Sequence, residues 1–110
     1  MTNNYGIPAL LEARIRAKYK FCVYCGLEMK VHSHAIGCPC DKATIEHLNE
    51  DSVLQPTENN IVMCCQSCNA SRGPKKLLDW FESEYCKKKN INSETVADVV
   101  KKYIKSREMN

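Results

Sequence analysis

The sequence predicts a small α+β protein in which two short strands and a helix are held together by a four-cysteine zinc site. One helix is expected before this core and two after it. The first observation is a pair of C-x-x-C motifs, Cys22/Cys25 and Cys65/Cys68, with 39 residues between them. The second is that two strand-like runs and one helical run lie between or directly after these motifs. The third is size, because a chain of 110 residues with eight aromatic side chains has a small core that a bound metal would stabilise.

The N-terminal part of the chain predicts a tail and a helix. Residues 1–6 are polar and are expected to be a frayed tail. Residues 7–20 predict an amphipathic helix, in which Pro8 suits the first turn. The apolar positions with helical spacing are Leu11, Ile15 and Tyr19.

Residues 21–73 are predicted to form the zinc-held core. The first C-x-x-C motif is followed by Gly26, which permits the tight turn that directs two thiolates at one ion. Residues 43–48 alternate between polar and apolar as a half-buried strand does, and residues 60–64 predict a short buried strand. Residues 65–72 then predict a helix, which a Gly-Pro pair ends.

Residues 74–110 are predicted to form the two C-terminal helices. The apolar stripe of the first is Leu77, Leu78, Phe81 and Tyr85. Trp80 lies to one side of that stripe, and the segment from Asn90 to Asn92 is expected to end the helix. Ser93 is the expected N-cap of the second helix. Its apolar stripe is Val96, Val99, Val100, Tyr103 and Ile104.

Charge and hydropathy indicate which partners and which location are expected for the protein. Residues 1–71 carry six Lys/Arg and seven Asp/Glu, whereas residues 72–110 carry ten and six. The basic C-terminal third either is simply solvated or faces a phosphate backbone. No segment has the roughly 18 consecutive apolar residues of a membrane span, so a membrane partner is not expected. The start of the chain does not resemble a secretory signal, which favours a cytoplasmic protein whose thiols bind metal.

The two C-x-x-C motifs predict a closed structural zinc site. Four thiolates in tetrahedral array suit Zn²⁺, and equal spacing in both halves, Cys22/Cys25 and Cys65/Cys68, makes the signal specific. The alternative is a disulfide framework, which the absence of a secretory signal disfavours.

Four further cysteines lie outside these motifs. Cys38 and Cys40, with His32 and His34 just before them, either hold a second metal or belong to a polar insertion without a site. Cys64 is expected to point into the core, and Cys86 is expected to be an inert helical residue.

An acidic residue, a histidine and two asparagines carry the candidate chemistry. Glu46 and His47 end the first predicted strand, Asn60 begins the second, and Asn69 follows a cysteine of the second motif. A neutral histidine can act as a base toward water at neutral pH. Carboxylate and amide oxygens are ligands suited to Mg²⁺ or Mn²⁺, which would stabilise charge on a phosphate.

At these residues, roughly over 21–73, the chain resembles the HNH endonuclease family, which has the ββα-metal fold. The family pattern is a C-x-x-C knuckle, an acidic-His pair, a loop, an Asn before an apolar run, and a second C-x-x-C followed by His or Asn. The matching residues here are Cys22, Cys25, Glu46, His47, Asn60, Cys65, Cys68 and Asn69.

The resemblance implies a role for each residue. His47 would be the general base that activates water, and Asn60 would orient the segment that carries it. Asn69 and Glu46 would bind the catalytic Mg²⁺ or Mn²⁺, while the four cysteines hold the structural zinc. Arg72 would meet a phosphate of the substrate, which its forked donors suit.

The resemblance therefore implies hydrolysis of DNA phosphodiester bonds, with double-stranded DNA as the partner. The expected nucleic-acid contacts are Arg72, Lys75 and Lys76. The alternative is a non-catalytic zinc-ribbon module that binds nucleic acid or protein. The sequence leaves open the base specificity, the choice between nicking and double-strand cleavage, the biological role, and whether the chain is a monomer or a homodimer.

Overall fold

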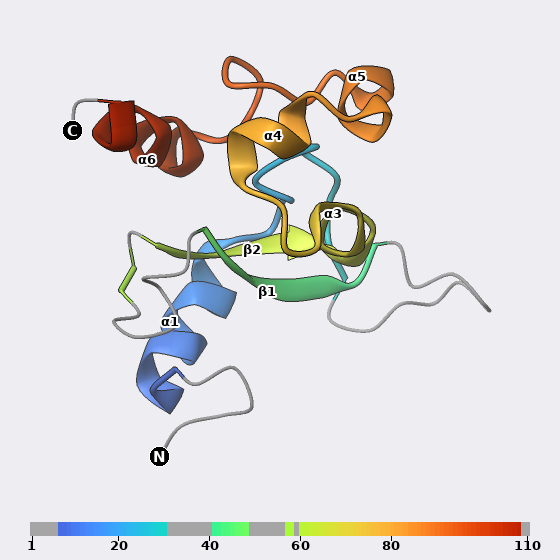
Figure 1. The fold of residues 1–110 in the computed structure, drawn as a ribbon. Coiled ribbons are helices and arrows are strands. Elements are labelled where there is room, and N and C mark those ends of the chain that lie inside the picture. The colour runs from blue at the N-terminus through green and yellow to red at the C-terminus, as the bar shows by residue number, and fades with distance from the viewer. Residues whose placement is uncertain (1–6, 31–40, 49–56, 59, 109–110) are drawn as a thin grey trace.

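The computed structural model describes residues 7–30, 41–48, 57–58 and 60–108. Within these ranges the chain is a mixed α+β structure with one two-stranded antiparallel sheet, which confirms the predicted fold class. The elements, in chain order, are α1 (Ala9–Lys18), β1 (Ala43–His47), β2 (Ile61–Cys65), α3 (Gln66–Arg72), α4 (Leu77–Phe81), α5 (Glu84–Lys89) and α6 (Asp98–Glu108) (Figure 1). None of these helices combines the length and the apolar character that a bilayer crossing needs.

The two strands form the centre of the structure. Residue pairs run from Ala43 opposite Cys65 to His47 opposite Ile61. Helix α3 follows β2 directly and packs on both strands, whereas α1 packs on β2. In the view of Figure 1 these two helices lie on opposite sides of the sheet. All five residues of β2 are therefore buried, as its wholly apolar sequence IVMCC predicts.

Residues 22–27, between α1 and β1, form a tight turn that is called the knuckle here. Its backbone is hydrogen-bonded to β2. Cys22 N–H donates to the Leu27 carbonyl at 2.8 Å, and Gly26 has a φ of +79°, which a side chain would disfavour. Val23 N–H donates to the Met63 carbonyl on β2 at 3.3 Å. These bonds fix the knuckle against the second strand.

The C-terminal part has three helices, so the prediction of two was wrong. The predicted first helix is interrupted at Glu82, and Ser83 begins a new one by accepting a hydrogen bond from Cys86 N–H at 3.3 Å. The expected apolar stripe holds in part, since Leu77 is buried and Phe81 and Tyr85 pack against the core. Leu78 is 52% exposed, whereas Trp80 is fully buried.

The last helix also begins later than predicted. Ser93 is not its N-cap, because α6 begins at Asp98. Instead, Asn92 Oδ1 accepts hydrogen bonds from the N–H groups of Glu94 and Thr95, which closes a turn before the helix. The predicted end of the preceding helix is confirmed, since Asn90 stops α5 in the left-handed conformation with a φ of 59°.

Trp80 is the largest fully buried side chain, and replacing it by alanine is expected to destabilise the protein by about 3–5 kcal/mol. Its ring packs edge-on against Tyr24 with centroids 4.9 Å apart, and its Nε1 donates to Ser71 Oγ at 3.0 Å. Urea unfolding would measure the change in the free energy of unfolding. Leu78→Ala, on the exposed side of the same helix, is the matched control and should cost less than about 1 kcal/mol. Equal losses for the two variants would contradict the position of Trp80 in the core.

Candidate metal centre and the polar cluster beside it

The four predicted zinc ligands meet in one place. The Sγ atoms of Cys22, Cys25, Cys65 and Cys68 all lie within 4.8 Å of one another. Cys25 Sγ is 3.7 Å from Cys65 Sγ. A tetrahedral zinc ion with Zn–S bonds of about 2.3 Å places its sulfurs about 3.8 Å apart, so this donor set fits such an ion. The structure therefore confirms a four-cysteine cluster that could hold a metal ion such as zinc.

Backbone N–H groups of the knuckle support the cluster. Those of Tyr24 and Cys25 both point at Cys22 Sγ, at 3.4 Å each. These two N–H groups lie in a turn that is closed by Gly26 N–H, which donates to the Cys22 carbonyl at 3.0 Å. Donors of this kind stabilise a metal-bound thiolate.

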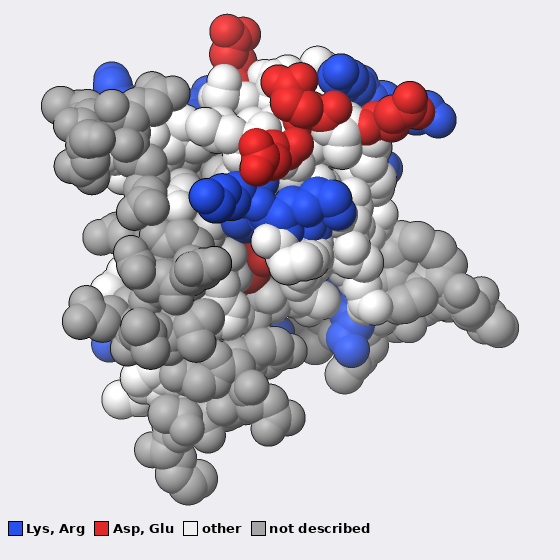
Figure 2. All heavy atoms as spheres, viewed as in Figure 1, with Lys and Arg blue, Asp and Glu red and all other residues white. Residues whose placement is uncertain are grey.

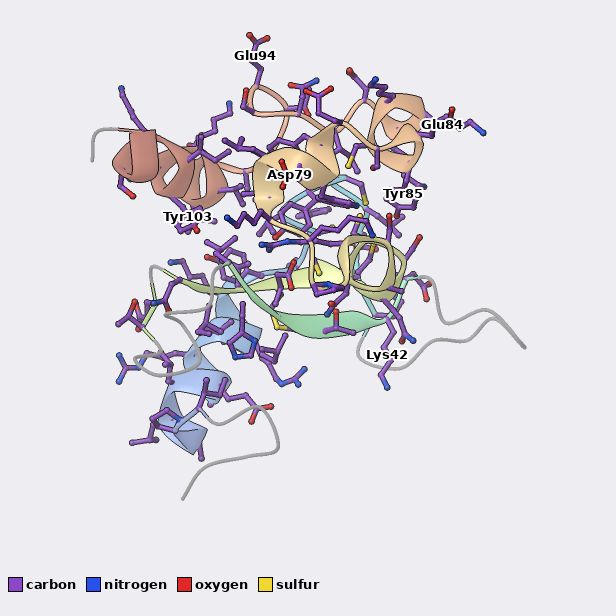
Figure 3. All side chains as sticks on the ribbon, viewed as in Figure 1. Lys42, Asp79, Glu84, Tyr85, Glu94 and Tyr103 are labelled. Atoms are coloured by element: carbon purple, nitrogen blue, oxygen red, sulfur yellow. The ribbon has the colours of Figure 1, made fainter. Side chains whose placement is uncertain are left out.

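Tyr85 on α5 also contacts the cluster, which the sequence did not indicate. Its hydroxyl donates to Cys68 Sγ at 3.3 Å and lies 2.7 Å from Ser67 Oγ. Figure 3 shows Tyr85 beside α3, below α5. Burial, and next the bond to Cys68, raise the pKa of Tyr85 above its ordinary value, which keeps the hydroxyl protonated and able to donate. Sequence spacing assigned Tyr85 to an apolar stripe and contains no signal for this hydrogen bond.

Among the described residues, Cys64 and Cys86 are not part of this cluster. Cys64 and Cys86 are fully buried, as expected, and burial raises the pKa of both thiols, so both remain neutral. The proposed second metal site at His32, His34, Cys38 and Cys40 lies outside the described residues.

A second group of side chains, called the polar cluster here, lies between β1 and α3. Its members are Tyr24, Thr44, Glu46, Asn69 and Arg72. Alternation along the strand places Thr44 and Glu46 on the face that α3 covers. Asn69 on α3 donates through Nδ2 to Thr44 Oγ1 and to the Ile45 carbonyl, both at 3.0 Å. Asn69 and Glu46, the two predicted ligands of a catalytic ion, thus belong to facing elements.

Arg72, one turn further along α3, is the centre of this cluster. Its Nη1 is 3.1 Å from Glu46 Oε2 and donates to Tyr24 Oη at 3.2 Å. Tyr24 Oη in turn donates to Glu46 Oε2 at 2.8 Å. Three backbone carbonyls accept the remaining hydrogen bonds of the guanidinium, those of His47, Leu48 and Lys75.

The charges of this cluster depend on one another. Burial raises the pKa of Glu46, while the charge of Arg72 and the hydroxyl of Tyr24 oppose that rise. Burial, followed by the charge of Glu46, also raises the pKa of Tyr24. Burial would lower the pKa of Arg72, but Tyr24 and Glu46 outweigh it and the net pKa is raised. The guanidinium therefore stays charged.

The position of Arg72 corrects one prediction. The sequence places it against a substrate phosphate, but the residue is only 6% exposed. The reason is helical spacing, because the third residue after Asn69 lies on the same face of α3 and meets Glu46. Lys75 and Lys76 are exposed, as a nucleic-acid contact requires. Figure 2 shows Lys and Arg side chains at the centre of this face with Asp and Glu above them, so the surface here is mixed in charge.

His47 lies at the end of β1, next to this cluster. Alternation directs its side chain to the face opposite Glu46, and its carbonyl accepts from Arg72 Nη1 at 3.2 Å. Its Nε2 is buried and has no hydrogen-bond partner among the described residues. An unpaired buried nitrogen is unfavourable, which makes this histidine unlike an ordinary structural one.

Asn60 organises the chain where β2 begins. Its Oδ1 accepts from Thr57 N–H at 2.8 Å, and its own carbonyl accepts from Leu48 N–H at 3.0 Å. The second bond ties the residue directly before β2 to the residue directly after His47.

The polar cluster does not fit a divalent ion in the arrangement described. Mg²⁺ and Mn²⁺ require several oxygen ligands, but the Glu46 carboxylate is engaged by Arg72 and Tyr24. Asn69 directs its amide nitrogen, not its oxygen, to the strand. The four-thiol cluster and the polar cluster therefore differ, since the first is arranged for a metal ion and the second already holds a cationic side chain.

Comparison of the chain with models of known protein families, with curated proteins and with solved structures found no match.

Proposed function

We propose that this protein is an HNH-type endonuclease that hydrolyses phosphodiester bonds in double-stranded DNA. The observation that carries the proposal is the arrangement around β1, β2 and α3. Glu46 and Asn69 lie on facing elements, His47 follows Glu46 at the end of the strand, and the four-cysteine cluster holds the start of α3. This is the order of parts that the resemblance to the family implies.

Different residues of the chain would have different roles in this reaction. His47 would take a proton from the attacking water through an imidazole nitrogen, which requires its side chain, directed by alternation away from Glu46, to reach the same phosphate. Asn60 fixes the backbone beside it through the bond to Leu48 N–H. Lys75 and Lys76 contact backbone phosphates from their exposed positions.

Glu46 and Asn69 carry the oxygen atoms that Mg²⁺ or Mn²⁺ would use, and such an ion would stabilise negative charge on the phosphate. In the arrangement described they do not fit that ion, because Arg72 and Tyr24 engage the Glu46 carboxylate and Asn69 presents its amide nitrogen to the strand. The four-cysteine cluster, with no open position, would hold zinc for structure alone.

The second candidate is a non-catalytic zinc module that binds nucleic acid or protein. The buried Arg72–Glu46 pair favours it, because a carboxylate paired in this way has a structural role. It leaves unexplained the buried Nε2 of His47, which has no hydrogen-bond partner among the described residues.

A plasmid assay separates the two functions. The zinc-loaded protein should nick supercoiled plasmid when Mg²⁺ or Mn²⁺ is added, and His47→Ala should reduce the rate at least about 100-fold because the general base is lost. Gel separation of nicked and supercoiled plasmid measures the rate.

Zinc content and melting temperature of His47→Ala should match those of the unaltered chain, so that lost activity is not lost folding. Lys88→Ala, at an exposed position on α5, is the control and should nick at the original rate. Equal rates for His47→Ala and Lys88→Ala, or no nicking with either ion, would exclude the proposed mechanism.

A further inference from the structure

A pocket of about 330 Å³ lies where the end of α1, the knuckle and the segment before α6 meet. The buried residues Val23 and Tyr24 line it from the knuckle, and the exposed residues Thr95 and Ala97 line it from the segment before α6. Ala97 N–H donates to the Val23 carbonyl at 2.8 Å, so a backbone hydrogen bond joins the two sides. Ligand pockets have volumes of roughly 300–1,000 Å³, and this one therefore suits a group no larger than a nucleotide.

The rim of the pocket at the end of α1 is basic. Lys18 and Lys20 line it, both are exposed, and neither forms a salt bridge among the described residues. The described residues that line the pocket include no acidic side chain. Glu28 pairs through its backbone with Phe21, but its carboxylate is 2.9 Å from Lys30 Nζ. This rim therefore carries an excess of positive charge, which complements the phosphates of a nucleic acid.

Phe21 supplies an exposed aromatic ring at the same rim. It lines the pocket and is 55% exposed, whereas every other aromatic residue that the structure describes is buried or half-buried. The backbone is fixed on both sides of it, because the Lys20 carbonyl accepts from Met29 N–H at 2.9 Å and Cys22 N–H donates to the Leu27 carbonyl at 2.8 Å. An exposed ring on a fixed backbone is a surface on which a base can stack.

We propose that this pocket binds an unpaired nucleotide of single-stranded DNA. The base stacks on Phe21, and Lys18 and Lys20 contact the adjoining phosphates. A base within a duplex is covered by its neighbours, so the pocket selects unpaired nucleotides. An acidic peptide would satisfy the lysines but has no flat ring for Phe21. The choice of DNA rests on the proposed function, which the inference deepens by naming an unpaired segment as part of the substrate.

Fluorescence anisotropy of a labelled oligothymidine of about 12 nucleotides tests the inference. The zinc-loaded protein is used without Mg²⁺ or Mn²⁺, so that cleavage does not interfere. Phe21→Ala should weaken binding at least about fivefold, because the stacking of one base is lost. Phe21→Leu, which keeps an apolar side chain without a π face, should weaken it similarly, whereas Phe21→Trp should retain the affinity. Leu78→Ala, which removes an exposed apolar side chain from α4, is the matched control and should bind as the unaltered chain does.

The salt dependence of the same binding tests the lysines. Each phosphate contact contributes about 0.7 to the slope of log affinity against log salt concentration for a single strand, so Lys20→Gln should reduce the slope by about that amount. Lys88→Gln, at an exposed position on α5, is the matched control and should leave the slope unchanged.

A blunt duplex and hexaglutamate complete the experiment. Phe21→Ala should leave the affinity for the duplex unchanged, and hexaglutamate should not displace the oligonucleotide. Equal single-strand affinities of Phe21→Ala and Leu78→Ala, an equal loss on the duplex, or displacement by hexaglutamate overturns the inference, even if the plasmid is nicked. Phe21-dependent binding of the single strand without plasmid nicking supports the pocket and excludes the nuclease.

Discussion

Cys65→Ser is expected to lose the bound zinc and, with it, the cooperative unfolding transition of the domain. Cys65 is the last residue of β2 and directly precedes α3, so it connects the strand to the helix. Its Sγ is 3.7 Å from that of Cys25 on the knuckle. Removing this thiolate leaves three ligands and weakens the attachment of the knuckle to the strand.

The size of the effect follows from the stability of small domains. Zinc binding contributes about 10–16 kcal/mol in zinc-finger peptides. A protein of this size is stable by about 5–15 kcal/mol in total, so losing most of that contribution unfolds it. Zinc content per chain and circular dichroism during heating measure the two expected losses, and a strong chelator should reproduce both in the unaltered chain.

Serine is a conservative choice at this position. Cys65 is the N-cap of α3 and its side chain makes no capping hydrogen bond. Serine is a favoured N-cap, so the substitution does not weaken the helix start. Cys64→Ala is the matched control, since it deletes a neighbouring buried thiol that is outside the cluster. It should keep its zinc and its transition; a Cys65→Ser protein as stable as this control would refute a structural metal site.

The sequence predicted the four-cysteine cluster correctly because each C-x-x-C motif is a local constraint. Two residues of separation and a following glycine determine where the thiolates of Cys22 and Cys25 point, whatever the rest of the chain does. The strand, strand and helix order was predictable for a similar reason, since the run around Ile45 alternates and the run around Val62 is a short continuous apolar stretch. Both features depend on short stretches of sequence.

The polar cluster depended on contacts between distant residues and was only partly predictable. The spacing of Asn69 and Arg72 places both on one face of α3, but does not show that this face meets Glu46. Tyr24 supplies the third partner from the knuckle, 22 residues before Glu46. A basic residue after a metal-binding motif therefore indicated a phosphate contact, while the folded chain uses the same charge to neutralise a buried carboxylate.

The C-terminal helices show the same limit. Helical spacing assigned Leu78 to the core and placed Trp80 beside the stripe, on the assumption of one continuous helix. The N-cap at Ser83 divides that helix, and in α4 the indole of Trp80 packs against Tyr24 and donates to Ser71 Oγ. Helical spacing alone therefore did not show which side of α4 faces the core.

The second large effect is expected at the buried ion pair. Glu46→Ala should lower the free energy of unfolding by about 3–5 kcal/mol, because it leaves the charge of Arg72 buried without its carboxylate. Urea denaturation of the zinc-loaded protein measures the loss. The Arg14–Glu58 pair is a suitable control, since its atoms are 2.8 Å apart but its side chains are 69% and 42% exposed. Glu58→Ala should cost less than about 1 kcal/mol.

A double variant tests whether the loss comes from the unpaired charge. Glu46→Leu with Arg72→Met replaces both charges by apolar side chains of similar size, which is often neutral for buried pairs. The double variant should therefore be more stable than Glu46→Ala, although the carbonyl oxygens of His47 and Leu48 lose their donor. If the effects of Glu46→Leu and Arg72→Met measured separately simply add, the two residues do not act as a pair. A strong coupling between them would establish that the carboxylate and the guanidinium stabilise the fold as a pair of charges.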